Sequence, residues 1–326
     1  MSFKPWLLLP PKLAHDLSPF ALNLIKHMVT STNDDWQSFT WRNLYFRNPL
    51  GIAGGVDKNV EQVDAWHRLG CGFIEVGTIT PLPQGPNPGK IMDRDILQRA
   101  VWNKMGFPNK GLEWAIQNLK KLKRPFYVPL FANIGKNRNT PLEKAAEDYK
   151  KCILALENFV DVFVINISSP NTKNLRDLLA PDSLKPFLQE VLSSRRQNTP
   201  TLLKLSPDLD DDTLQNILNV SLAANIDGWI LTNTTLSRPS NISFPQEGGL
   251  SGEPLATTSK DFLKKSLRFL GEHRQDKLVI STGGIMNADD VQERIRMGAD
   301  LVQVYSTLIF EGPFFFKKTL KCLKQS

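Results

Sequence analysis

The sequence predicts an α/β protein, a (β/α)8 TIM barrel preceded by an N-terminal two-helix extension. From about residue 48 onward, short apolar segments alternate with longer amphipathic segments. The apolar runs are continuous rather than alternating, as expected of parallel strands that are covered on both faces. About eight such units in roughly 280 residues match a (β/α)8 barrel. A doubly wound sheet is the alternative.

Eight segments are expected to form the barrel strands. They lie at 50–53, 72–77, 126–134, 160–167, 201–205, 228–232, 278–281 and 301–305. The helices between them carry start signals. Thr140, followed by Pro141 and Glu143, predicts an N-cap. Residues 210–212, all Asp, place negative charge at the start of a helix that contains Leu214.

The first 40 residues do not follow this alternation. Their apolar residues Leu13, Leu17, Phe20, Leu24 and Met28 recur at helical spacing. Ser18-Pro19 predicts the start of a second helix, with Ser as N-cap and Pro in first position. We therefore expect a helical extension over 1–40 and a barrel domain over 41–326. Spacing alone allows the extension to cover the barrel or to touch a membrane as the lid of a hydrophobic-ligand site.

Composition excludes several classes of protein. Hydrophobic residues make up 41% and charged residues 22%, as in soluble globular proteins. Three widely spaced cysteines suggest neither a disulfide framework nor a zinc site, so a reducing compartment is expected. The net charge of +7 suits an anionic substrate, a phosphate-bearing cofactor or an anionic lipid surface. No basic block is interleaved with aromatic residues, so no nucleic-acid partner is expected.

The positions of the reactive side chains argue against several catalytic mechanisms. The four histidines, His15, His27, His67 and His273, all lie away from the ends of the expected strands. Catalysis by a Ser-His or Cys-His pair is therefore not expected. Carboxylates do not gather at strand ends either, so no metal site is expected.

Gly, Asn, Ser, Thr and Lys are the residues that follow the expected strands. Amide side chains and bare backbone can bind the edge of a planar heterocycle, and lysines can stabilise negative charge on it. Gly283-Gly284 and Tyr305-Ser306, after the last two strands, suit a phosphate. Two long connections, 80–107 and 235–252, follow strands on the same side. The pattern indicates a flat, phosphate-bearing cofactor; FMN fits because it brings its own redox chemistry.

Several motifs carry a resemblance to a known family. They are Gly55-Val56-Asp57-Lys58, Asn103-Lys104-Met105-Gly106-Phe107, Asn133-Ile134-Gly135-Lys136-Asn137, Asn166-Ile167-Ser168-Ser169-Pro170-Asn171-Thr172, Thr232-Asn233-Thr234-Thr235 and Gly248-Gly249-Leu250-Ser251-Gly252. Together they resemble the dihydroorotate dehydrogenase family over nearly the whole chain. Ser169 stands where the soluble class has a cysteine base. This serine and the N-terminal extension resemble the membrane-associated, quinone-dependent class (class 2).

The resemblance implies oxidation of (S)-dihydroorotate to orotate in de novo pyrimidine biosynthesis. It implies that Ser169 removes the proton from C5, that a hydride passes from C6 to N5 of FMN, and that ubiquinone or menaquinone reoxidises the flavin. A free serine hydroxyl is a poor base, so a closed, water-poor site is needed. Thr172 and Phe107 are implied as relay and gate, and Lys58 as the group that stabilises negative charge.

The resemblance also implies two sets of binding residues. Those for the substrate are Lys58, Asn103, Lys104, Met105, Gly106, Phe107, Asn166, Asn171, Asn233 and Thr234. Those for the cofactor are Gly54, Gly55, Val56, Asp57, Lys58, Thr78, Asn133, Asn166, Lys204, Thr232, Gly252, Gly284, Tyr305 and Ser306.

The class implies a monomer that rests on a membrane through its N-terminal helices, between which the quinone enters. Without a transit peptide ahead of them, the expected place is the cytoplasmic side of a bacterial inner membrane. Ile280-Ser281-Thr282 is more polar than is usual in the family. Two alternatives are another FMN barrel oxidoreductase and a non-catalytic flavin- or pyrimidine-binding barrel. The presence of both Ser169 and Lys58 argues against each.

Overall fold

Eight parallel strands close into a barrel in the computed structural model, which describes residues 4–29, 35–123 and 128–324. The strands are β3 (Leu50–Asp57), β4 (Phe73–Ile79), β7 (Leu130–Ile134), β8 (Val162–Asn166), β9 (Thr201–Leu205), β10 (Gly228–Leu231), β12 (Leu278–Thr282) and β13 (Leu301–Val304). Pairing of β13 with β3 closes the ring. Each of the eight expected strands is confirmed; residues 126 and 127 of the third lie outside the described residues.

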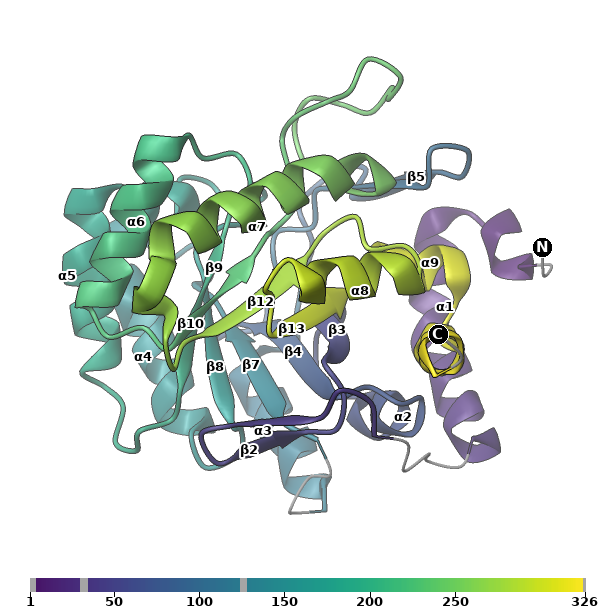
Figure 1. The fold of residues 1–326 in the computed structure, drawn as a ribbon, viewed down its shortest axis with the longest axis horizontal. Coiled ribbons are helices and arrows are strands. Elements are labelled where there is room, and N and C mark those ends of the chain that lie inside the picture. The colour runs from purple at the N-terminus through teal and green to yellow at the C-terminus, as the bar shows by residue number, and fades with distance from the viewer. Residues whose placement is uncertain (1–3, 30–34, 124–127, 325–326) are drawn as a thin grey trace.

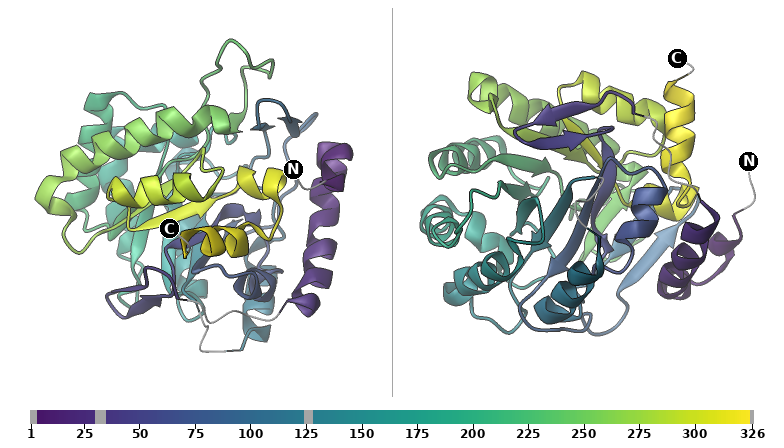
Figure 2. Two further views of the ribbon diagram at one scale, coloured as in Figure 1. Left: turned by 45° about the vertical axis from the view of Figure 1, so that its right-hand side comes forward. Right: turned by 90° about the horizontal axis from the view of Figure 1, so that it is seen from below.

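Helices surround the barrel on its outer face (Figures 1 and 2). They are α2 (Val63–Arg68), α3 (Gly111–Lys121), α4 (Ala145–Leu156), α5 (Pro181–Leu192), α6 (Asp211–Ala223), α7 (Ala256–Leu270), α8 (Ala288–Arg296), α9 (Ser306–Glu311) and α10 (Phe315–Leu323). The buried sides of these helices and the outward side chains of the strands form the main apolar core. A (β/α)8 barrel, rather than a doubly wound sheet, is therefore the fold.

The N-terminal end of the barrel is closed by a hairpin of β1 (Phe39–Trp41) and β2 (Leu44–Phe46). Phe46 is fully buried, and its ring lies 6.1 Å from that of Phe73 and 6.3 Å from that of Phe131. These aromatic contacts fill the barrel interior at this end. Within the described residues, this packing closes one end of the barrel and leaves the end where the strands finish for a ligand.

The two helix starts predicted within the barrel differ in outcome. Asp210 caps α6, since its carboxylate accepts a hydrogen bond from the Thr213 amide at 2.7 Å. The Thr140 cap is wrong, because α4 begins only at Ala145, after the 3-10 turn η2 (Leu142–Lys144). The Thr140 hydroxyl instead donates to the Asp148 carboxylate at 2.6 Å, and a charged acceptor makes the stronger bond.

The N-terminal extension is helical, as expected, but it is not two α-helices. A 3-10 turn, η1 (Pro5–Leu8), precedes a single helix, α1 (Pro11–Met28), which continues through Pro19. Pro19 lacks the amide that would bond the His15 carbonyl. The Ser18 hydroxyl replaces it by donating to that carbonyl at 2.8 Å, so the helix tolerates the proline.

The two long connections form a separate, three-stranded antiparallel sheet. One supplies β5 (Met92–Asp95) and β6 (Ala100–Asn103), and the other supplies β11 (Gly249–Gly252). In the β6–β11 pairing, Asn103 lies opposite Gly249. The Arg94 guanidinium of β5 donates to the carbonyls of Trp6, Leu7 and Leu9, so this sheet also holds the start of the extension.

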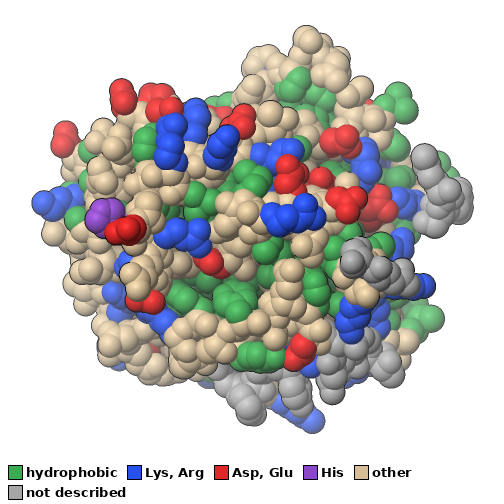
Figure 3. Space-filling view, in the orientation of Figure 1, with side chains coloured by type: hydrophobic (Ala, Val, Ile, Leu, Met, Phe, Trp, Pro, Cys, Tyr) green, Lys and Arg blue, Asp and Glu red, His purple; other side chains and the backbone are tan. Residues whose placement is uncertain are grey.

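None of the described helices is long and apolar enough to cross a membrane. On the face shown in Figure 3, Lys and Arg side chains are interspersed with Asp and Glu. The basic side chains of this face are therefore mixed with acidic ones rather than gathered into one patch.

Candidate active site

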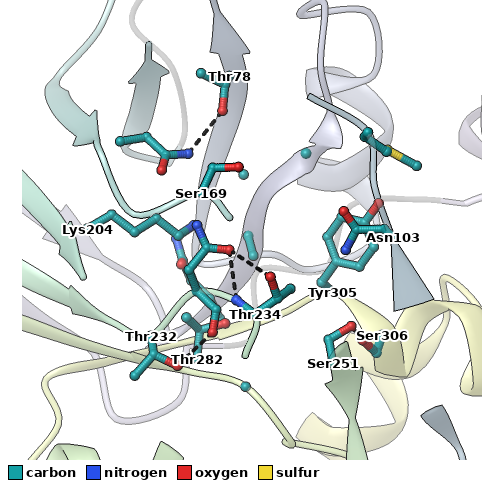
Figure 4. A pocket seen from close by; sticks show the side chains of 18 of the residues that line it. Thr78, Asn103, Ser169, Lys204, Thr232, Thr234, Ser251, Thr282, Tyr305 and Ser306 are labelled. Carbon is teal, nitrogen blue, oxygen red and sulfur yellow. Dashed lines mark hydrogen bonds between the residues drawn. The ribbon is translucent and has the colours of Figure 1, made fainter. Parts of the chain in front are cut away.

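A cavity of ≈ 1010 Å³, counting space open to solvent, lies at the carboxyl ends of the barrel strands. Most of the predicted site residues line it: Gly54, Gly55, Lys58, Thr78, Asn103, Met105, Gly106, Phe107, Asn166, Ser169, Asn171, Lys204, Thr232, Asn233, Thr234, Gly284, Tyr305 and Ser306. In Figure 4, Ser169, Lys204 and Thr234 approach from one side, and Tyr305 and Ser306 from the other. The structure thus brings residues from distant parts of the chain to one place.

Six predicted residues do not line this cavity: Val56, Asp57, Lys104, Asn133, Thr172 and Gly252. Asp57 faces its own loop, where its carboxylate accepts from the amides of Glu61 and Gln62 at 2.9 and 2.8 Å. This fixes the loop that carries Lys58. Lys104 points to the surface and forms an ion pair with Glu247 at 2.7 Å.

A network of buried amides supports the floor of the cavity. Thr78 Oγ1 donates to Asn133 Oδ1 at 2.6 Å, and Asn166 Nδ2 donates to the same oxygen at 3.1 Å. Asn133 and Asn166 are both nearly fully buried. Asn133 therefore holds Thr78 and Asn166 in place from behind the cavity wall.

Glu75 is a fully buried carboxylate that sequence reasoning missed. Its oxygens accept from Asn133 Nδ2 at 2.5 Å, from Lys204 Nζ at 3.3 Å and from Gln303 Nε2. A buried charge needs such partners. The available signal was the single acidic residue inside an otherwise apolar strand, 73–76.

Ser169 follows β8, and only 5% of its surface is exposed. Its Oγ accepts from the Asn171 amide at 3.2 Å, which orients the hydroxyl oxygen. Asn171 Nδ2 in turn donates to Asn103 Oδ1 at 2.9 Å. Among the described residues, the buried Thr172 Oγ1 and Asn171 Oδ1 have no hydrogen-bond partner. Asn171 Oδ1 belongs to a residue that lines the cavity and is available to a ligand, whereas Thr172 Oγ1 lies behind the cavity wall and is available to a water molecule.

Lys58 is joined to the N-terminal extension. Its Nζ lies 2.8 Å from His15 Nε2 on α1. Burial lowers the pKa of Lys58 to about 8, although the nearby carboxylates of Asp57 and Asp16 raise it. Burial, and then the Lys58 charge, also lower the pKa of His15. His15 was not predicted at the site, because nothing in its local sequence indicates which barrel loop α1 contacts.

The far end of the cavity is built from backbone. Gly284 has φ +69°, and a Cβ there would lie 2.2 Å from the Ala256 Cα. Gly252 has φ +93°, and a Cβ there would lie 2.1 Å from the Arg99 carbonyl oxygen. Ser306 Oγ donates to Ser251 Oγ at 2.8 Å. Close-packed glycines and hydroxyls of this kind fit the phosphate end of a cofactor.

No group of three or more His, Cys, Asp or Glu side chains suited to a metal occurs among the residues the structure describes. The donors in the cavity are instead amides, hydroxyls and two lysines, Lys58 and Lys204. Such donors suit a flat, polar, partly anionic organic ligand. The fold and the site together define a (β/α)8 barrel with a polar ligand cavity at the carboxyl ends of its strands.

The chain belongs to the dihydroorotate dehydrogenase family. The model of that family, described as dihydroorotate dehydrogenase, matches residues 38–326. A dihydroorotate dehydrogenase (quinone) of Neisseria meningitidis is 40% identical over 325 residues, covering 96% of this chain and 95% of the relative. A dihydroorotate dehydrogenase (quinone) of Thermus thermophilus is 43% identical over 281 residues, covering 84% of this chain and 79% of the relative.

Solved structures agree with this assignment. The crystal structure of DHODH from Eimeria tenella in complex with ferulenol has a TM-score of 0.86 and 32% sequence identity. The match covers 96% of this chain and 90% of that chain. The ligand-free structure from the same organism gives the same score and identity, covering 96% and 94%.

Proposed function

We propose that this protein oxidises dihydroorotate to orotate in pyrimidine biosynthesis, with FMN as cofactor and a membrane quinone as final electron acceptor. One observation carries the proposal. Ser169, Lys58 and the three asparagines Asn103, Asn171 and Asn233 line a single cavity. A general base, a cation and several amides are what abstraction of a proton from a carboxylated pyrimidine requires.

The cavity suits FMN in its chemistry. Gly284 and Ser306, which line the cavity, would hold the phosphate, and Gly252 would support them from behind the wall. Lys204, Thr78 and Thr232 would hold the ring. When bound, FMN would supply a two-electron acceptor, and a quinone can reoxidise the reduced flavin. Another FMN-dependent oxidoreductase activity is not favoured, because Ser169 and Lys58 both line the cavity.

In this proposal Ser169 takes the C5 proton of dihydroorotate. A serine hydroxyl needs help, since its pKa lies far above neutrality. Its near-complete burial excludes water, and Thr172, whose hydroxyl lacks a partner within the described residues, would pass the proton onward. Phe107 borders the same space and would limit the entry of water. Lys58 would hold the negative charge that develops on the substrate.

The exposed apolar residues of α1 support a membrane contact. Phe20 is 74% and Met28 78% exposed, and Leu13, Leu17 and Leu24 are also exposed. Figure 1 places α1 on the opposite side of the barrel from α5 and α6. We propose that this face rests on the cytoplasmic side of a bacterial inner membrane and that ubiquinone or menaquinone reaches the flavin beside α1. The protein would act as a monomer.

The test is the Ser169→Ala variant, mixed with dihydroorotate without oxygen at pH 7 while flavin absorbance is followed. We expect bound flavin to be retained and its reduction to slow by at least about 100-fold, since general-base catalysis contributes about that much. The control is Ser266→Ala, which changes a buried serine of α7 whose hydroxyl donates to the Phe262 carbonyl at 2.8 Å, outside the cavity. Reduction at the parent rate in Ser169→Ala would overturn the assignment of the base.

A further inference from the structure

Arg294 is a buried cation for which the proposed reaction gives no role. It lies on α8, and only 1% of its surface is exposed. Within the described part of the chain, none of the carboxylates lies within ion-pair distance of it. Its neighbour Glu293 pairs with Lys260, and Asp290 takes part in the capping box of α8. Burial lowers the pKa of Arg294 to about 10, so it keeps its charge at neutral pH.

The guanidinium is bonded to the loop that ends the cavity. Nη2 donates to the Gly283 carbonyl at 3.0 Å, to the Ala256 carbonyl at 3.1 Å and to Ser259 Oγ at 2.8 Å. Nη1 donates to Ser281 Oγ at 3.1 Å. Ser281 is one of the polar residues in the 280–282 segment that departs from the family pattern. Its hydroxyl accepts a bond from this arginine.

These bonds place the charge directly behind the phosphate end of the cavity. Thr282, Gly283 and Gly284 line the cavity, and Gly284 packs on Ala256, the first residue of α7. Arg294 donates to a carbonyl of each segment and so ties the Gly283-Gly284 loop to the start of α7. Helix α7, fifteen residues long, adds its positive end at the same point.

We propose that Arg294 is a positioning residue for the cofactor phosphate. It would fix the Gly283-Gly284 loop against the start of α7, and its charge would balance the phosphate dianion from behind. Burying an unpaired cation is costly, and an anion in the adjacent cavity would offset that cost. The inference rests on the proposed FMN cofactor, but it concerns phosphate recognition alone and not the oxidation of substrate.

The test compares FMN with riboflavin, which has the same ring but no phosphate. Dissociation constants for both are measured by flavin fluorescence on the full chain stripped of flavin. Arg294→Met should weaken FMN binding by at least about tenfold and leave riboflavin binding within about twofold, because only FMN carries the anion. Arg294→Lys keeps the charge and should keep most of the preference for FMN. Ser281→Ala, which removes one neutral partner, is the matched control.

Each result of the comparison between FMN and riboflavin either supports or overturns the proposed role of Arg294. An equal loss of FMN and riboflavin binding in Arg294→Met would mean that the arginine is only structural. Should that variant fail to fold, Arg294→Gln keeps amide donors without the charge and gives the same comparison. If the parent protein and the Arg294→Met and Arg294→Gln variants all bind FMN more tightly than riboflavin by the same factor, this inference is overturned. The proposed function is then unaffected. A parent that binds neither flavin overturns both.

Discussion

His15 Nε2 on the N-terminal helix lies 2.8 Å from Nζ of Lys58 in the barrel. The other ring nitrogen, Nδ1, lies 3.1 Å from the Asp16 carboxylate. A ring that donates to Asp16 through Nδ1 accepts from the lysine through Nε2. The extension is therefore connected to the proposed substrate site by a side-chain hydrogen bond.

This bond predicts a change in pH dependence. Lys58 is charged below its pKa of about 8, so orotate, an anion, should bind well below that pH and weaken above it. His15→Leu removes the acceptor, which favours the neutral lysine, so the midpoint of weakening should fall by about one pH unit. The measurement is the dissociation constant of orotate from pH 6 to 10, read from the flavin spectrum.

The matched control is His27→Leu, an exposed histidine on the same helix. It should leave the midpoint where it is in the parent. An unchanged midpoint in His15→Leu would show that the contact does not set the charge on Lys58. Truncation of residues 1–40 is a less clean test of the extension, because it removes His15 together with the apolar face of α1.

Glu75 is predicted to stabilise the barrel interior. Glu75→Leu leaves the ammonium of Lys204 buried without its carboxylate, and should lower the free energy of unfolding by about 3–5 kcal/mol. Glu75→Gln should cost less, because the amide oxygen can still accept. Unfolding in urea measures both. Glu190→Leu, which breaks the surface pair with Lys150, should cost about 0–1 kcal/mol; an equal loss in both leucine variants would refute the role of Glu75.

The exposed face of α1 is predicted to serve the quinone step. Phe20→Ser combined with Leu24→Ser should lower binding to phospholipid vesicles and turnover with a long-chain quinone by at least about tenfold, since apolar area is lost from the contact. Flavin reduction by dihydroorotate should stay unchanged. Leu154→Ser on α4 is the control. A double variant that binds vesicles as the parent does would place the membrane contact elsewhere.

The sequence predicted the barrel well, because each strand is a continuous apolar run and polar residues mark where it ends. The polar cavity residues that directly follow the strands came from the same rule, since the ends of parallel strands meet. Asn103, Met105, Gly106 and Phe107, on the long connection after β4, were implied only by the family resemblance. The helix through Pro19 and the bond from Thr140 to Asp148 were not predictable in this way. Both depend on the hydrogen-bond acceptor of a single hydroxyl: the His15 carbonyl for Ser18 and the Asp148 carboxylate for Thr140. Local sequence signals do not identify these acceptors.

A different cause explains why Glu75, His15 and Arg294 were not predicted from the sequence. The pairs His15–Lys58 and Glu75–Lys204 join residues 43 and 129 positions apart. Arg294 bonds residues on other elements of the fold, up to 38 positions away. Only the folded barrel brings such partners together. The division into 1–40 and 41–326 remains a prediction, and the His15–Lys58 bond argues that the two parts act together.

The most direct test of the proposed function is an anaerobic flavin spectrum. The purified protein is mixed first with dihydroorotate and then with a ubiquinone analogue in detergent. We predict that the flavin absorbance bleaches on the first addition and returns on the second. A flavin band that does not respond to dihydroorotate would contradict the proposal, while leaving the barrel and its cavity as described.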